Sequence, residues 1–192
     1  MFCQLPSYAG ANKMDLHQIQ LSYQVEEDRL LFRVSFKDGQ GGLQEIRSWL
    51  TRRFVRNFWP GVLQTMEKQV ALAQPAAAHA SAELVGMGHE ASVSEIREAG
   101  GFDAPFEAAA DSFPLGDAPL LITAAHLAID ADRPLRIDFV SPGRGSFEVA
   151  FTATMLHGFC TLLQEAVKKA DWDIELVLPG MAAGGAGPRV LN

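Results

Sequence analysis

The chain carries one pattern twice. Residues 16–73 hold three stretches of alternating apolar and polar residues and then apolar residues at helical spacing, and residues 120–174 repeat that order. Alternation is typical of strands with one buried face, and the helical spacing is typical of an amphipathic helix. Residues 50–58 align with 151–159, which puts Thr51 and Thr152 at the same helix N-cap position. The sequence therefore predicts an α+β fold of two tandem β-β-β-α repeats, forming a pseudo-symmetric body of antiparallel sheet and helix.

The pattern divides the chain into five parts. We expect an extension over residues 1–14, a first unit over 15–73, a connector over 74–118, a second unit with a terminal strand over 119–178, and a disordered tail over 179–192. Met14 directly precedes the first strand and is a candidate start of the chain. Pro60 should kink or split the first helix. The connector, rich in Ala, should be a mobile insert with one short helix from Ser92 to Ala99.

Charge and composition narrow the class of protein. The net charge of −7 arises in the connector, whereas the two units are nearly neutral. Such an acidic segment disfavours nucleic acid as a partner without excluding it. The sequence shows no apolar stretch long enough to span a bilayer and no signal peptide, and Cys3 and Cys160 form no disulfide framework. We therefore expect a soluble protein in the reducing cytoplasm, with no membrane partner.

The outer sheet face of the first unit is polar to basic and includes a tryptophan. We expect Trp49 to lie opposite Arg33, with arginines of the following helix start nearby. Cations interleaved with an aromatic side chain are typical of surfaces that bind single-stranded nucleic acid. A solvated face is the plainer interpretation. The candidate binding face comprises Arg33, Lys37, Arg47, Trp49, Arg52, Arg53 and Arg56.

The outer sheet face of the second unit combines small and apolar residues, Ile122, Ala124, Ala128, Val140 and Ala150, with a polar row. We expect such a face to be shielded from water by another segment or protein, which could be the connector, a second chain or a partner. In a symmetric hairpin register, the polar row crosses three strands, and its two facing carboxylates call for a cation. A solvated cluster is the plainer interpretation, and the alternatives for the cation are His126 itself, Arg136 reaching diagonally, or a metal ion. The row consists of His126, Asp138 and Glu148.

Function is less constrained than fold. The sequence contains no phosphate-binding loop, no nucleophile elbow and no zinc-protease motif, so it predicts no catalytic residue and no cofactor. In outline, the two sheet-plus-helix units are similar to the repeats of the Pur-alpha and Whirly families, which have four strands per unit and bind single-stranded nucleic acid. The leading hypothesis is a non-enzymatic interaction or assembly module that binds a protein partner or itself. A single-stranded nucleic-acid binder is the alternative, and a metal-dependent enzyme comes third.

Overall fold

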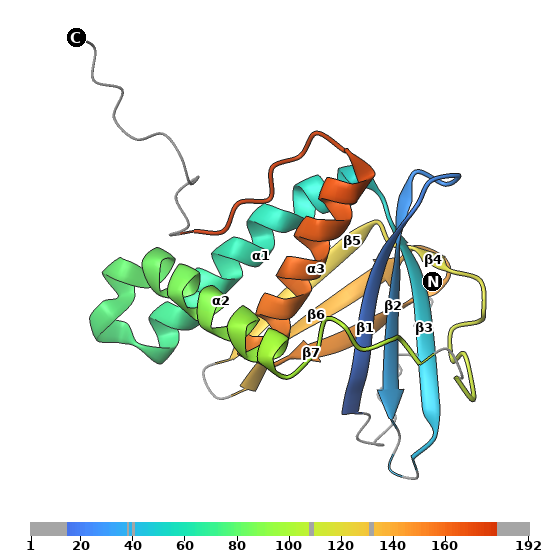
Figure 1. The fold of residues 1–192 in the computed structure, drawn as a ribbon, viewed down its shortest axis with the longest axis horizontal. Coiled ribbons are helices and arrows are strands. Elements are labelled where there is room, and N and C mark those ends of the chain that lie inside the picture. Colours follow the sequence, from blue (N-terminus) through green and yellow to red (C-terminus); the bar gives the residue numbers. More distant parts are fainter. Residues whose placement is uncertain (1–14, 38, 40, 108–109, 131–132, 180–192) are drawn as a thin grey trace, which may run out of the picture.

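The structure, a computed structural model, describes residues 15–37, 39, 41–107, 110–130 and 133–179 (Figure 1). The expectations for Met14, for the N-terminal extension and for the tail beyond residue 179 lie outside these residues. The first unit contains strands β1 (Asp15–Gln24), β2 (Arg29–Lys37) and β3 (Leu43–Leu50) and helix α1 (Arg52–Ala73). The connector contains the 3-10 helix η1 (Pro75–Ala80) and helix α2 (Ser81–Glu98). Strands β4 (Leu120–Leu121), β5 (Ala124–Asp130), β6 (Arg133–Ser141) and β7 (Gly145–Phe151) and helix α3 (Ala153–Ala170) follow.

The strands form two sheets, which confirms the predicted α+β fold with two β-β-β-α units. One sheet has the order β1-β2-β3-β4, with β4 parallel to β3, and the other is antiparallel with the order β5-β6-β7. The predicted terminal strand is wrong. Residues 172–178 form no strand in the described part of the chain, and side chains of the helices hold them instead. Gln164 Nε2 donates to the carbonyl of Leu176 at 2.6 Å, and Trp59 Nε1 donates to that of Val177 at 3.2 Å.

Helices α1 and α3 begin as the sequence predicts. The Thr51 hydroxyl accepts a hydrogen bond from the Phe54 backbone N–H at 3.1 Å, and the Thr152 hydroxyl accepts one from the Met155 N–H at 3.2 Å. Each bond satisfies one of the N–H groups that a helix start leaves without an intrahelical partner. Helix α1 is not split at Pro60, which lies on its exposed side. None of the helices in the described part of the chain is long and apolar enough to cross a membrane.

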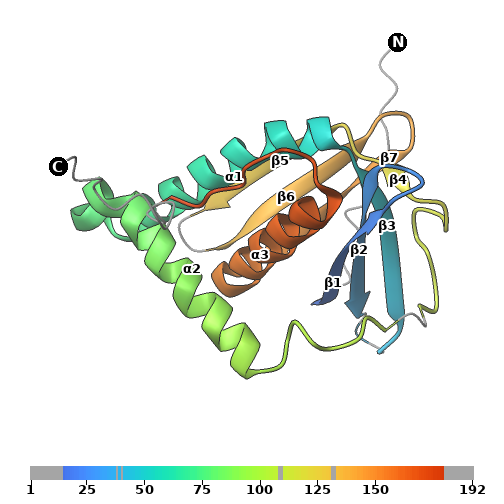
Figure 2. The same ribbon diagram turned by 45° about the horizontal axis from the view of Figure 1, so that its top comes forward.

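The two units share one core and interlock. The inner sheet faces meet at Phe32 of β2 and Phe139 of β6, whose ring centroids are 5.3 Å apart. Phe159 of α3 contacts Phe32 at 5.5 Å, and Phe58 of α1 contacts Phe139 at 6.0 Å. Helix α3 packs beside β1 and helix α1 beside β5, so each helix lies against the first strand of the other unit (Figure 2). Neither unit therefore completes its apolar contacts alone.

The connector is folded onto the body, which corrects the prediction of a mobile insert with a short helix. Helix α2 begins at Ser81 rather than Ser92 and packs against α3 and α1. Alanine is the best helix former, so this alanine-rich stretch favours helix once the other helices offer a surface. Gly100, with φ of +70°, follows the end of α2, and the chain then runs across the first sheet (Figure 1).

Candidate interaction surfaces

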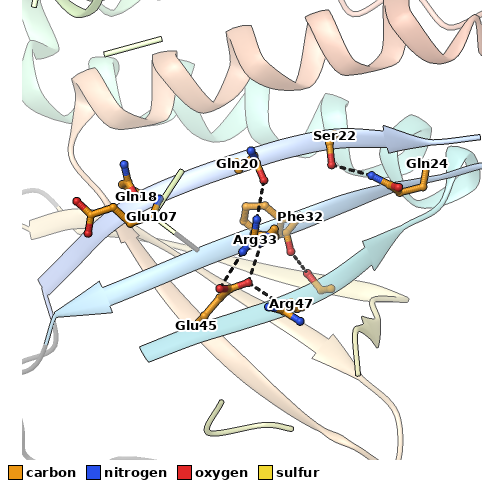
Figure 3. A network of polar contacts seen from close by, with 10 residues as sticks. Gln18, Gln20, Ser22, Gln24, Phe32, Arg33, Glu45, Arg47 and Glu107 are labelled. Carbon is orange, nitrogen blue, oxygen red and sulfur yellow. Dashed lines mark hydrogen bonds and ion pairs between the residues drawn. The ribbon is translucent and has the colours of Figure 1, made fainter. Parts of the chain in front are cut away.

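The outer face of the first sheet carries a buried ionic network (Figure 3). Glu45 of β3 is fully buried and accepts hydrogen bonds from Arg33 Nε at 2.7 Å, Arg33 Nη2 at 3.0 Å and Arg47 Nε at 2.7 Å. Arg33 Nη1 also donates to Gln20 Oε1 at 3.1 Å. Burial raises the pKa of Glu45, but the hydrogen bonds and charges of the two arginines outweigh it, so the pKa falls below its usual value.

The connector covers this network with aromatic rings. The Arg33 guanidinium lies 4.1 Å from the ring centroid of Phe106, and that of Arg47 lies 4.5 Å from the ring centroid of Phe113. Cations on aromatic faces gain electrostatic stabilisation, and more so when they are shielded from water. Only 15% of the Arg33 side chain and 29% of the Arg47 side chain remain exposed. Glu45 and the two phenylalanine rings therefore supply partners for both arginines from within the chain.

The connector also pairs with the edge of β3. Asp111 accepts a hydrogen bond from the Leu43 N–H through its carboxylate at 2.7 Å and donates its own N–H to the Leu43 carbonyl at 2.8 Å. The Glu45 N–H donates to the Ser112 carbonyl at 3.0 Å, and β4 then pairs with Ser48 and Trp49. These contacts close most of an edge that would otherwise present unpaired backbone groups.

The candidate binding face of the sequence analysis is thus divided by the structure. Arg33 and Arg47 are engaged by Glu45, whereas Lys37, Arg52, Arg53 and Arg56 are exposed and Trp49 is half-buried. The predicted register is wrong, because Arg33 pairs with Arg47 and Trp49 with Leu31. The observed register is shifted by two residues along β3 from the one that we expected, so Lys37 pairs with Leu43.

Sequence reasoning missed Glu45, Phe106 and Phe113. Strand alternation places Glu45 on the same face as Arg47, and this was the available signal. The two phenylalanines stand out in a segment that is otherwise short of large apolar residues. Their role depends on tertiary contacts with arginines of β2 and β3 that lie 73 and 66 residues earlier, which spacing alone does not reveal.

The outer face of the second sheet is open where the first is covered. The connector was one of its predicted covers, but Phe106 and residues 111–113 lie on the first sheet instead. Ile122, which we placed on this face, is buried in the core because β5 begins only at Ala124. Exposed or half-buried side chains from all three strands make up the outer face of the second sheet: Ala124, His126, Ala128, Arg136, Asp138, Val140, Ser146, Glu148 and Ala150.

The predicted polar row has the register that we expected. His126 pairs with Asp138, and Asp138 pairs with Glu148. Arg136 Nη1 lies 3.8 Å from Glu148 Oε2, with 41% and 52% of the two side chains exposed. Among the described residues, no group of three or more His, Cys, Asp or Glu is placed to hold a metal ion. Asp138 and Glu148 are therefore two adjacent carboxylates with one arginine at the edge of ion-pair range.

Asp138 and Glu148 occupy the positions that Arg33 and Arg47 hold in the first sheet. In each unit the two residues pair across the second and third strands, at matching distances from the helix N-cap. The first pair is cationic and is bridged by a buried carboxylate, whereas the second pair is anionic and open to solvent. Like charges directly opposite on neighbouring strands repel, so a cation between the second pair stabilises this face.

Two grooves lie where the helices meet the first strands. The groove between α3 and β1 has a volume of about 410 Å³ and is lined partly by connector residues, among them Phe102 and Phe106. The groove between α1 and β5 has a volume of about 620 Å³, and the described residues that line it belong to Thr51, α1 and the stretch 121–127. Its walls are mostly apolar, with Arg53 and Asn57 as the larger polar groups.

A buried histidine pair joins α2 to α3. The Nδ1 atoms of His89 and His157 are 3.3 Å apart, so one ring donates to the other. Burial, and then the neighbouring His89, lowers the pKa of His157 to about 4, and burial is also the main reason that the pKa of His89 is lowered. Burial raises the pKa of the Cys160 thiol to about 12, which keeps it protonated and unreactive at neutral pH. These groups fit a role in packing.

Comparisons of the chain with models of protein families, with curated proteins and with solved structures gave no match.

Proposed function

We propose that the protein is a non-enzymatic interaction module that binds a protein partner through the outer face of the second sheet. One observation carries the proposal. The same β-β-β-α unit occurs twice, and the outer face of the first sheet is covered by the connector while the equivalent second face is open. Small side chains on a broad, exposed sheet allow a partner to approach closely.

The internal contact on the first sheet indicates the chemistry of the partner. There, one carboxylate joins two arginines and phenylalanine rings cover them. On the second sheet the signs are reversed, so a lysine or arginine of the partner, placed between Asp138 and Glu148, would join the two carboxylates. Alanine and valine side chains around the pair would contact apolar groups of the partner. Opposite charges at an interface chiefly determine specificity and association rate.

Photo-crosslinking tests the proposal in the cells that express the protein. A benzophenone amino acid at Ala128 or Ala150, both on the exposed face, should yield a discrete crosslinked species. The same group at Lys68 on the exposed side of α1 is the control and should not. Asp138→Asn with Glu148→Gln should diminish the species. A species that contains two copies of the chain identifies self-association, and equal crosslinking from all positions, or none, refutes the proposal.

The exposed arginines at the start of α1 favour a second candidate, binding of single-stranded nucleic acid. Arg52, Arg53 and Arg56 lie within two turns and face solvent. Without Arg33 and Arg47, however, this site lacks the cations that would have flanked Trp49. If a labelled oligonucleotide binds at low salt, the salt dependence should fall on Arg53→Glu and remain unchanged on Lys37→Glu, at the far end of the first sheet.

A further inference from the structure

The two grooves are counterparts of each other. When the units are aligned on the caps Thr51 and Thr152, the four α3 residues of one groove fall on four α1 residues of the other. The matched pairs are Met155 with Phe54, Gly158 with Asn57, Phe159 with Phe58, and Leu162 with Gly61. By strand pairing, residues 18–21 of the first groove fall on residues 124–127 of the second. The internal repeat has thus produced the same groove twice.

One of these grooves has a segment of the connector as part of its wall. Residues 101–106 follow α2 into the α3–β1 groove, where Phe102 and Phe106 contribute to its lining. The Gln18 amide clamps the segment by donating to the Pro105 carbonyl at 3.2 Å and accepting from the Glu107 N–H at 2.9 Å. His17 Nε2 also lies 3.2 Å from the Glu107 carboxylate. A segment with two phenylalanines and an acidic end therefore packs along the side of this type of groove.

The α1–β5 groove is also apolar with a few polar groups, but these lie on its helix and not on its strand. Phe54, Phe58 and Leu127 are among the apolar side chains that line it. The position equivalent to Gln18 is Ala124, whereas Arg53 and Asn57 of α1 supply a cation and a carboxamide. Both residues are exposed, and α1 has no acidic residue in its first turn to offset the cation or the helix dipole.

We propose that the α1–β5 groove binds an extended, acidic, phenylalanine-containing segment of a partner protein. A phenylalanine of the segment fills the apolar floor between Phe54, Phe58 and Leu127. Arg53 pairs with a carboxylate of the segment, and the Asn57 amide bonds its backbone as Gln18 bonds residues 105 and 107 in the other groove. Recognition by an apolar groove with a few placed polar groups is a common mode for peptide ligands.

The inference rests on the protein being an interaction module, but its site is separate from the outer face of the second sheet. The two proposals therefore fail separately. Substitution of Asp138 and Glu148 should leave peptide binding unchanged, and substitution in the groove should leave crosslinking at Ala150 unchanged.

A fluorescein-labelled peptide with the sequence of residues 101–107 is the probe, and fluorescence anisotropy with the full chain at low salt is the measurement. The protein should bind the peptide, and binding should weaken at least about tenfold when both phenylalanines of the peptide are replaced by alanine. Gly61→Leu fills the groove with the side chain that Leu162 provides in its counterpart. An ideal Cβ at Gly61 meets only Leu127 Cδ1, at 3.9 Å, so the variant should fold.

Matched controls on the same helix separate the groove from the general surface. Gly61→Leu should abolish binding while Gln64→Leu, at an exposed position outside the groove, should not change it. Arg53→Glu should weaken binding at least about tenfold, and Lys68→Glu, with the same change in net charge, should have little effect.

Four results would overturn the proposal. The first is no binding of the peptide by the unaltered chain, and the second is equal binding by the unaltered chain and Gly61→Leu. The third is a dimer in light scattering that Gly61→Leu dissociates in the absence of peptide, which would assign the groove to a second copy. An unlabelled oligonucleotide that displaces the peptide more strongly than unlabelled peptide would assign it to nucleic acid instead.

Discussion

Glu45→Gln should destabilise the protein by about 2–4 kcal/mol, because Glu45 is a fully buried carboxylate that accepts three charge-assisted hydrogen bonds. Removing one member of a buried ion pair typically costs about 3–5 kcal/mol. Here Arg33 and Arg47 keep 15% and 29% of their side chains exposed, so they regain some hydration and the lower part of the range applies. Glutamine keeps the volume and one acceptor but loses the charge.

Urea denaturation followed by circular dichroism measures this free energy at pH 7. Glu27→Gln is the control, because Glu27 and Arg29 form an exposed pair at 3.9 Å that should contribute under about 0.5 kcal/mol. The pKa of Glu45 is lowered in the folded state, so its contribution is complete above the pKa of the unfolded chain. The contribution is lost as the pH falls through the folded pKa, and the two proteins should then converge in stability. A difference below about 1 kcal/mol at pH 7, or one that persists in acid, would refute this reasoning.

Three further predictions follow from the packing of the connector and the C-terminal segment. The pKa of His157 is lowered to about 4, so stability should fall by about 1–2 kcal/mol between pH 6.5 and 5, and His157→Gln should remove most of that fall as measured by urea denaturation. Limited proteolysis should spare residues 81–107 in the unaltered protein and cut there first in Glu45→Gln, and equal cleavage would contradict the role of the network. Trp172→Phe removes the hydrogen bond to Asp28 Oδ1 at 2.8 Å and should lower stability by about 1 kcal/mol, whereas an unchanged unfolding midpoint would show that the bond contributes nothing.

The periodic elements were predictable because their signals are local. Alternating apolar residues predicted the strands. Thr51 and Thr152 predicted the starts of α1 and α3, because an N-cap depends only on a side-chain oxygen and the backbone of the next turn. The second hairpin register was also predictable, because the turn between Ser141 and Gly145 leaves little freedom. The looser glycine-rich turn before Leu43 gave no such constraint, and the pairing of Trp49 was wrong there.

The position of the connector was not predictable from local signals. Its cover depends on contacts between Phe106 and Arg33 and between Phe113 and Arg47, which join residues distant in sequence. Helix α2 depends in the same way on packing against α3. The candidate nucleic-acid surface was therefore predicted incorrectly in part, because Arg33 and Arg47 are bound to Glu45. Buried polar residues on an outer sheet face are recognised only when the covering segment is known.

We expect the connector to cover the outer face of the first sheet and to leave that of the second open. Arginine labelling with phenylglyoxal, followed by peptide mass spectrometry, measures this difference. In the folded protein, Arg53, Arg56 and Arg136 should react, while Arg33 and Arg47 should be protected until the chain is unfolded in urea. Labelling of Arg33 and Arg47 at the rate of Arg53 in the folded protein would contradict the account.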